Sequence, residues 1–260
     1  MFNKNYFNFI QDKKAFTLIE LLISVTIISI LGAMILISVG GLRNKARITK
    51  AQEFNRTIQS SIGYTAVGVW KFDDEGISAT DESGYGNNCV ISNAEYIDDT
   101  ANDYGRSLKF SGTESSYINC GDDALAGKEQ TWVVWVKRNE ATEGSVINQT
   151  SSGTGYEPIY FNTEGDIKFY SSKTGNSDYF DTNIPANRWT HIAMVLNNEF
   201  VKCYIDGKFF AEKEDDCWDF GKKELVIGKE FDGVIDEVFI YEKAFETREI
   251  QKHFADLRRK

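Results

Sequence analysis

The sequence predicts a mainly β protein, with a sandwich of short strands that follows a long N-terminal helix and ends in a short C-terminal one. Three observations predict this fold. Residues 21–42 carry no charged side chain, and short runs rich in β-branched and aromatic residues begin at Val69, separated by Asn, Asp and Gly. The chain also has 18 Phe, 12 Tyr and 5 Trp but only 2 Pro, a composition that suits a sandwich with many tight turns.

The N-terminal apolar stretch is long enough to cross a membrane. As a helix that rises about 1.5 Å per residue, residues 21–42 span about 33 Å, and a bilayer core is about 30 Å thick. Glu20 stands at the start of this stretch, where an unpaired carboxylate is costly, so we expect it to have a partner. Apolar residues then recur in part at three- and four-residue spacing, which predicts one transmembrane and stalk helix over residues 16–62.

The start of the chain resembles the class III signal of type IV pilins and pseudopilins, with a basic pair, a small residue and the run FTLIE before the apolar stretch. The resemblance implies that residues 1–15 are a leader and that a prepilin peptidase cuts between Ala15 and Phe16 and methylates the new amine. It also implies that Glu20 pairs with the amine of a neighbouring pilin subunit. Ala15 stands where the family usually has Gly. An uncleaved anchor and a removed signal peptide are the alternatives, although a signal peptide has its small-residue site after the apolar region.

Basic residues flank both ends of the apolar stretch, and their count slightly favours a cytoplasmic head. The resemblance to prepilins decides the orientation instead, because the peptidase requires a cytoplasmic leader. We therefore expect a single-pass protein of the inner or plasma membrane with an extracytoplasmic head, which reaches the cell surface in a filament after assembly.

Short strands are predicted along the rest of the chain, and a helix is predicted at its end, where Ile250, Phe254 and Leu257 share one face. Asp206 and Gly207 predict a type I′ hairpin turn, because both residue types tolerate a positive φ. The predicted strands are residues 130–137, 188–197, 199–206, 208–212, 224–229 and 233–242.

Four segments in this order resemble laminin-G-like, concanavalin A-like jelly rolls. They are residues 69–88, 106–120, 188–208 and 231–254. The resemblance covers residues 67–257 and implies a jelly-roll domain over residues 67–260. It indicates the fold more strongly than the function, because this sandwich serves lectins, enzyme modules, adhesins and spacers.

Four cysteines fall in the expected extracytoplasmic part and allow three pairings. Thirteen residues separate Cys203 from Cys217 around the predicted Asp206–Gly207 turn, a spacing that suits a link across or beyond one hairpin. We therefore favour disulfides Cys203–Cys217 and Cys89–Cys120. A zinc site would prefer C-x2-C pairs, which are absent. Free buried thiols are the alternative.

Oxygen-bearing side chains in residues 73–88 are candidate calcium ligands. Asp81 and Asn87, joined by Asp236 from the last strand, would supply the carboxylate and amide oxygens that Ca²⁺ prefers. Some laminin-G-like relatives bind calcium near these loops. The alternative is a tight turn in which Asp and Ser side chains cap backbone groups.

A glycan site would need exposed aromatic rings. Trp132 and Trp135 are three residues apart in one predicted strand, so they point to opposite faces, one inward and one outward. Tyr156 lies in a segment rich in Ser, Thr, Asn and Gly. Trp135 and Tyr156 are therefore candidate ligand-binding residues, with ordinary sheet packing as the alternative.

Catalysis and nucleic-acid binding have little support. The predicted strands lack the E-x-D-x-x-E or E-x-D-x-E pattern of jelly-roll glucanases, and His191 is expected to pack within its strand. The net charge is −10, and no basic cluster with aromatic residues is present in the head, which argues against nucleic-acid binding. We expect no enzyme activity.

These patterns predict a minor pilin of a type IV filament with a head for adhesion to a glycan or a surface protein, and calcium as a candidate cofactor. The expected partners are the prepilin peptidase, the membrane and other pilins. A pseudopilin of a type II secretion or DNA-uptake system and a surface-anchored glycoside hydrolase are the alternatives.

Overall fold

The computed structural model describes residues 18–29, 66–73, 75–121, 129–140, 143–151, 154–171, 176–197, 199–214 and 224–258. The predicted cleavage site between Ala15 and Phe16 and the predicted helix beyond residue 29 lie outside these residues. The chain divides into two compact units, Met1–Asn55 and Arg56–Lys260, and each is described by itself.

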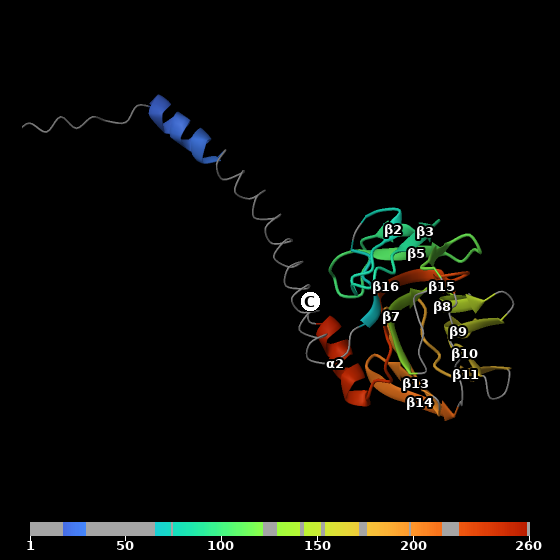
Figure 1. Ribbon diagram of the computed structural model, residues 1–260. Helices are drawn as coiled ribbons and strands as arrows, with labels where there is room; N and C mark the ends of the chain where they lie inside the picture. Colours follow the sequence, from blue (N-terminus) through green and yellow to red (C-terminus); the bar gives the residue numbers. More distant parts are fainter. Residues whose placement is uncertain are drawn as a thin grey trace, which may run out of the picture. The chain divides into compact units, whose positions relative to one another are not determined.

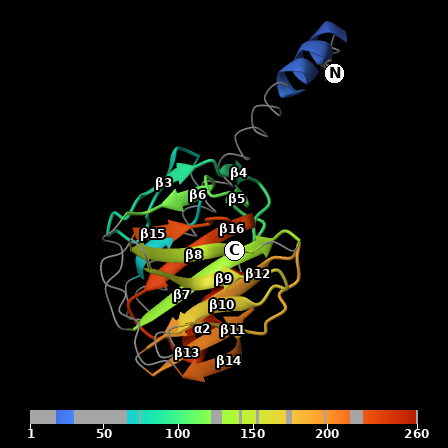
Figure 2. The same cartoon turned by 90° about the vertical axis from the view of Figure 1, so that its right-hand side faces the viewer.

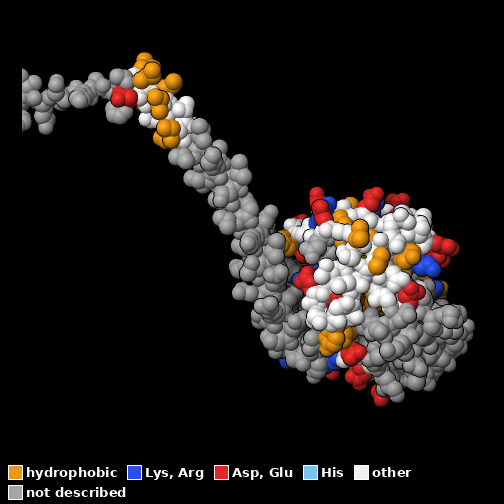
Figure 3. Space-filling view, turned by 45° about the horizontal axis from the view of Figure 1, so that its top comes forward, with side chains coloured by type: hydrophobic (Ala, Val, Ile, Leu, Met, Phe, Trp, Pro, Cys, Tyr) orange, Lys and Arg blue, Asp and Glu red, His pale blue; other side chains and the backbone are white. Residues whose placement is uncertain are grey.

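In the first unit, residues 18–29 form a helix whose apolar side chains are exposed (Figure 3). The hydroxyls of Ser24, Thr26 and Ser29 donate hydrogen bonds to backbone carbonyls three or four residues earlier, at 2.7–2.8 Å. These bonds satisfy the hydroxyls on the helix itself, as an apolar surrounding requires. Among the described residues, no helix has both the length and the apolar character needed to span a membrane.

The second unit is a sandwich of two antiparallel sheets with a helix at the C-terminal end (Figure 1). The first sheet has the strand order β14-β13-β12-β7-β16-β5-β4, and β1 pairs with the second half of β16. Its strands are β1 (Ala66–Trp70), β4 (Glu95–Ile97), β5 (Ser107–Ser111), β7 (Gln130–Arg138), β12 (Thr190–Leu196), β13 (Phe200–Ile205), β14 (Lys208–Glu214) and β16 (Asp232–Tyr241).

The second sheet has the order β11-β10-β9-β8-β15-β6-β3-β2. Figure 2 shows β8, β9, β10 and β11 side by side, in front of strands of the first sheet. Its strands are β2 (Ser78–Ala79), β3 (Cys89–Ser92), β6 (Tyr117–Asn119), β8 (Gly144–Ser151), β9 (Thr154–Phe161), β10 (Ile167–Ser171), β11 (Asn176–Phe180) and β15 (Glu224–Ile227).

The main core fills the space between the two sheets. Alternate residues of each strand point inward, as the period of a strand requires. The largest of these side chains are fully buried, among them Trp70, Trp132, Phe110, Phe161 and Phe169. A second apolar cluster covers the outer face of the first sheet.

Helix α2 (Thr247–Leu257) covers that outer face. Ile250 and Leu257 are buried there against β-strand residues such as Val133 and Tyr204. Both apolar clusters lie within residues 66–257, so the Arg56–Lys260 unit contains its own core. The predicted apolar face of the C-terminal helix is confirmed.

The strands predicted in residues 130–137 and 188–242 are all present. The predicted hairpin turn is present between β13 and β14, where φ is +49° at Asp206 and +74° at Gly207. The strands β8 to β11 were not among those predicted. They form three successive hairpins in the segment rich in Ser, Thr, Asn and Gly.

Candidate functional site

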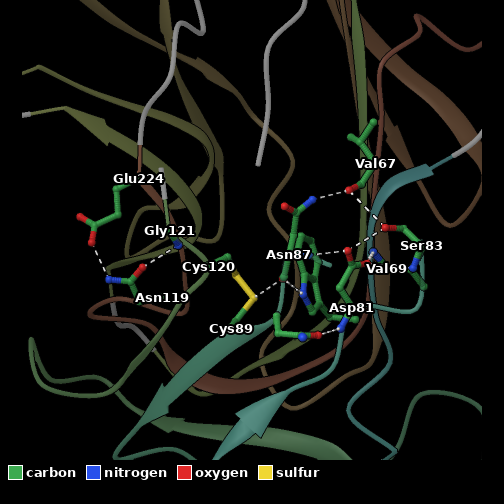
Figure 4. Close-up of a disulfide and its surroundings, with 12 residues drawn as sticks. Val67, Val69, Asp81, Ser83, Asn87, Cys89, Asn119, Cys120, Gly121 and Glu224 are labelled. Atoms are coloured by element: carbon green, nitrogen blue, oxygen red, sulfur yellow. Dashed lines mark hydrogen bonds between the residues drawn. A yellow bond between two sulfur atoms is a disulfide. The ribbon is translucent and has the colours of Figure 1, made fainter. Parts of the chain in front are cut away.

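Asp81 organises the loop that joins β2 to β3 (Figure 4). Its Oδ1 accepts hydrogen bonds from the backbone N–H groups of Val69 (3.0 Å) and Ser83 (2.8 Å). Its Oδ2 accepts from the Ser83 hydroxyl (2.7 Å) and from the N–H of Asn87 (2.9 Å). Both carboxylate oxygens are therefore occupied by donors of the protein itself.

Asn87 fixes the same loop to β1. Its side-chain amide donates to the carbonyl of Val67 (2.8 Å), and its own carbonyl accepts from the indole N–H of Trp70 (3.0 Å). Two residues later, Cys89 forms a disulfide with Cys120 just after β6 (Figure 4). The predicted Cys89–Cys120 bond is confirmed, and the loop has the hydrogen bonding expected of the tight-turn alternative.

Asp236 lies buried on β16, where its Oδ2 accepts a hydrogen bond from the N–H of Ala101 (3.1 Å). Burial, followed by the neighbouring charge of Glu237, raises the pKa of Asp236 well above its usual range. Within the described ranges, no group of three His, Cys, Asp or Glu side chains is arranged to hold a metal ion. Because Asp81 already accepts four hydrogen bonds, it does not fit the role of a calcium ligand beside Asn87 and Asp236; calcium binding by the head stays a prediction.

Trp135 requires a correction. Trp132 and Trp135 point to opposite faces of β7, as predicted, but Trp135 is only 4% exposed because α2 covers it. Its ring stacks on Phe254 with centroids 5.7 Å apart. Trp135 therefore cannot present a ring to a ligand in solution. The other predicted ligand-binding residue, Tyr156, lies on β9, and its side chain is outside the described part of the structure.

Cys203 also requires a correction. Its thiol is free and fully buried in the core between the sheets, so it does not form the predicted bond to Cys217. Burial raises the pKa of this thiol. The inward direction of the Cys203 side chain is the physical reason, because β13 alternates between core and outer face. Cys217 itself lies outside the described residues.

His191 is fully buried beneath α2, and neither of its ring nitrogens has a hydrogen-bond partner. Burial, followed by the charge of His253, lowers its pKa well below 6.5. A neutral imidazole closed off from solvent has no route to act as a base on a dissolved substrate. The prediction that His191 packs within its strand is confirmed.

An aromatic row crosses the outer face of the second sheet. In the register of β9, β10 and β11, Lys168 is flanked by Tyr160 on one side and Tyr179 on the other. The neighbouring row, Phe161, Ile167 and Phe180, points into the core, so the row with the two tyrosines points away from it. Tyr179 is 39% exposed.

Tyr160 is held in position from two sides. The ammonium of Lys168 lies 3.6 Å from the centroid of the Tyr160 ring, a cation–π contact. The Tyr160 hydroxyl donates to a carboxylate oxygen of Glu143 at 3.0 Å. The candidate residues from the sequence did not include Tyr160 and Tyr179, although the alternation of Ile167, Lys168 and Phe169 in β10 was a signal for a strand.

Comparison with protein families gives two matches. Residues 10–36 match the prokaryotic N-terminal methylation motif, which confirms the predicted prepilin signal. Residues 111–251 match the laminin-G-type family of the concanavalin A-like lectin/glucanases superfamily. A comparison with curated protein sequences finds no match.

Solved structures share the sandwich. Domain 4 of AbnA, a GH43 extracellular arabinanase from Geobacillus stearothermophilus solved with arabinotriose, is similar at a TM-score of 0.60 and 21% identity, over 73% of this chain and 98% of that domain. The binding domain of Paraclostridial Mosquitocidal Protein 1 is similar at a TM-score of 0.58 and 16% identity, over 73% of this chain and 52% of that chain. The botulinum neurotoxin serotype D ligand-binding domain, solved with N-acetylneuraminic acid, is similar at a TM-score of 0.59 and 16% identity, over 76% of this chain and 52% of that chain.

This chain thus spans about half the length of the two toxin domains. Identities this low show a shared fold and no shared ligand. The family match is broader, because residues 111–251 make up more than half of the 260 residues. The chain therefore belongs to the concanavalin A-like lectin/glucanases superfamily.

Proposed function

We propose that this protein is a minor pilin of a type IV filament whose jelly-roll head binds a carbohydrate outside the cell. The observation that carries the proposal is the presence, in one chain, of the methylation motif at residues 10–36 and the lectin-type domain at residues 111–251. The motif supplies the route to the filament, and the domain supplies a binding surface.

The N-terminal part is proposed to insert in the inner or plasma membrane as a single span, with residues 1–15 cytoplasmic until a prepilin peptidase removes them. The exposed apolar side chains of residues 18–29 support this proposal, because such a helix needs lipid or neighbouring helices around it. Intact-mass measurement of protein from membranes should give a chain that begins at Phe16 and carries one methyl group. A full-length chain in cells that contain the peptidase would contradict the proposal.

A carbohydrate is the proposed ligand because two structures with the same sandwich were solved with a sugar, arabinotriose in one and N-acetylneuraminic acid in the other. The outer face of β9 to β11 offers tyrosine rings for such a ligand. Glycan-array binding by residues 56–260, which contain their own core, tests the proposal. Absence of binding to every sugar on the array would argue for a protein ligand or for a purely structural head.

Calcium remains a candidate cofactor because the loops of the head are rich in acidic residues, although the Asp81 carboxylate already accepts four hydrogen bonds from the protein. Repeating the array in millimolar calcium and in chelator tests this candidate. Binding that appears only with calcium would support it.

A surface-anchored hydrolase is the second candidate, because the AbnA domain is part of an arabinanase. Glycoside hydrolysis uses a pair of carboxylates, and the absence of the E-x-D-x-x-E and E-x-D-x-E patterns from the predicted strands favours binding over catalysis. Release of reducing sugar from arabinan or β-glucan by residues 56–260 would favour the hydrolase. The pseudopilin alternative is separated from the minor pilin by location, because only the pilin is expected in filaments sheared from the cell surface.

A further inference from the structure

We infer that the head carries two complementary docking surfaces at opposite edges of its sandwich, and that each surface binds the other one on a second copy of this chain. The acidic edge consists of β2, β3 and the loop between them, with Ile77, Tyr85 and Val90. The basic edge lies where β14 meets α2, with Phe209 and Phe210. The inference goes beyond the proposed binding of a carbohydrate and does not depend on it.

The acidic edge groups large apolar side chains on the surface. Ile77, Val90 and Tyr85 are 88%, 62% and 62% exposed. The first two are neighbours, because the carbonyl of Ile77 accepts a hydrogen bond from the N–H of Ile91 (3.1 Å). Val90 points outward, since the preceding residue, Cys89, is buried between the sheets. Tyr85 lies in the loop that joins the two strands. Exposed apolar side chains gathered in this way are typical of a protein–protein contact.

The acidic edge is also fixed in shape. The Asp81 carboxylate accepts four hydrogen bonds that hold its loop against β1, and the Cys89–Cys120 disulfide ties β3 to the end of β6. A surface that is already ordered loses little conformational entropy when a partner docks on it, which favours binding.

The charge at this edge has one sign. Residues 72–105, which form β2, β3, β4 and their connections, contain nine Asp and Glu and no Lys or Arg. Ion pairs from Lys71, Arg106 and Lys137 balance only part of this charge. Figure 3 shows acidic side chains around exposed apolar ones on this side of the head. A partner surface should therefore be apolar at its centre and basic at its rim.

The basic edge supplies the apolar centre. Phe209 and Phe210 on β14 are 50% and 43% exposed. The register of β13 and β14 skips Phe210, which marks a β-bulge in this edge strand. A bulge hinders the addition of another strand, so side chains rather than backbone groups are available for contact. Helix α2 adjoins this hairpin so closely that a Cβ at Gly207 would lie 2.7 Å from the Phe254 ring.

The basic rim comes from the C-terminal segment and from the start of β14. Residues 247–260 contain five Lys and Arg and only two Asp and Glu, in a chain whose net charge is −10. Arg258 is exposed, and its guanidinium lies 5.5 Å from the centroid of the Phe254 ring. Lys208, also exposed, precedes Phe209 in β14. The basic edge thus has the composition that the acidic edge requires of its partner.

The two surfaces lie at opposite edges of the sandwich. On one side β2 and β4 end their sheets, and the Tyr96 hydroxyl donates to the carbonyl of Ser78 (3.4 Å). On the other side β11 and β14 end them, and the Lys213 ammonium donates to the Asp178 carboxylate (2.7 Å). Figures 1 and 2 both place β3 and β14 at opposite ends of the head.

This arrangement decides the type of assembly. Because the complementary surfaces differ and lie at opposite edges, two copies meet head to tail, and the same contact can be repeated with a third copy. In a filament the neighbouring subunits are held close together, which raises the effective concentration of each surface for the other. A contact that is weak between separate heads is then sufficient.

The test is a complementation experiment with residues 56–260, which contain their own core. The double variant Ile77→Ser/Val90→Ser damages the acidic edge, and Phe210→Ser/Arg258→Glu damages the basic edge. Val90→Ile and Phe210→Leu are the matched controls, because they keep an apolar side chain at each edge. Sedimentation velocity over a range of protein concentrations measures the mass of each protein alone and of an equimolar mixture of the two double variants. Melting curves show whether each variant keeps its fold.

We expect the wild type to form dimers and longer oligomers as its concentration rises, and high salt to weaken this association. Each double variant alone should associate at least about tenfold more weakly, because apolar contact area is lost. Their mixture should form a dimer and nothing larger, since each variant keeps one intact surface. The two control variants should associate like the wild type.

A wild-type head that stays monomeric at every concentration overturns the inference and leaves the carbohydrate-binding function untouched. Association that one double variant abolishes and the mixture does not restore indicates a symmetric contact through a single edge, which overturns the head-to-tail arrangement. Association that neither double variant weakens places the contact on another surface and overturns both edges.

Discussion

The rings of His191 and His253 lie 6.1 Å apart, centroid to centroid, beneath helix α2. His191 comes from β12 in the first sheet and His253 from the helix. The hydroxyl of Tyr241 lies 3.0 Å from Nε2 of His253, and Trp135, Phe239 and Phe254 surround the pair with aromatic rings. The attachment of α2 to the sheet is therefore sensitive to protonation of His191, whose pKa burial lowers.

The first prediction concerns acid. The pKa of His191 is lowered in the folded head, whereas the unfolded chain takes up a proton near pH 6.5. The unfolded state thus binds more protons below pH 6.5, so the free energy of unfolding should be constant above that pH and fall as the pH drops below it. Urea unfolding of residues 56–260 at pH 7.5 and 5.5 measures the loss.

The control for this prediction is His191→Leu. Asp236 acts in the opposite direction, because its raised pKa makes the folded state bind a proton more readily than the unfolded one as the pH falls. Comparison of the wild type with His191→Leu cancels that contribution. Equal losses of stability in the two proteins between pH 7.5 and 5.5 would show that His191 is not the responsible group.

The second prediction concerns Glu20. If its carboxylate pairs with the amine of a neighbouring subunit, Glu20→Ala should accumulate in the membrane and be missing from sheared filaments, because losing an acid makes the helix more apolar. Immunoblots of membrane and sheared fractions measure both. Glu20→Asp, which keeps the charge on a shorter side chain, is the matched control and should assemble better than the Ala variant. Normal assembly of Glu20→Ala would remove the ion-pair argument.

The third prediction concerns the Cys89–Cys120 disulfide, which closes a loop with a sequence separation of 31. Replacement of both residues by Ala should lower the free energy of unfolding by about 3–4 kcal/mol through the entropy of the unfolded chain. Urea unfolding with and without reductant measures it. Cys203→Ala should leave the effect of reductant intact, because Cys203 forms no bond. A wild-type head that is insensitive to reductant would contradict the prediction.

Much of the sandwich could be predicted from sequence because its strands are strongly apolar. Residues such as 130–137 and 233–242 combine β-branched and aromatic side chains with flanking turns, and they are strands. The β8–β11 hairpins were missed because their outer positions carry polar residues such as Ser145 and Lys168, which weakens the β signal. The outer face of these strands, which carries Tyr160 and Tyr179, was therefore not predicted from the sequence.

The burial of Trp135 shows a second limit of prediction from sequence. The strand period correctly separated Trp132 from Trp135, but it could not show what covers the outer face. The apolar side of the C-terminal helix was also predicted correctly, yet a single sequence does not say which sheet that side covers. The folded structure supplies this information, because the stacking of Trp135 on Phe254 shows that the helix covers the outer face of the first sheet.

The fourth prediction concerns Gln149, whose two amide atoms are buried without a hydrogen-bond partner. Gln149 pairs with Leu225, which points into the core. Gln149→Met keeps the length of the side chain and removes the unsatisfied amide, so it should raise the free energy of unfolding by about 1–2 kcal/mol. Urea unfolding measures the change.

The matched control is Gln130→Met. Gln130 is equally buried, but its Oε1 accepts a hydrogen bond from the indole of Trp132 at 2.8 Å. The same substitution should therefore lower stability at Gln130, since it leaves the indole N–H without an acceptor. If both variants change stability in the same direction, the difference in hydrogen bonding is not the cause.

The last prediction separates the two roles of Asp81. Asp81→Ala leaves four donors without their acceptor, so the free energy of unfolding should fall by about 3–5 kcal/mol. Because this loss involves no metal, it should be the same in millimolar calcium and in chelator. Ser83→Ala removes only one of the four bonds and should lose a smaller part. A calcium ligand would behave differently, since calcium at 100 times its dissociation constant adds about 2.7 kcal/mol to the wild type alone. A calcium-dependent rise in stability that disappears in Asp81→Ala would overturn the turn-organising role and restore Asp81 as a ligand.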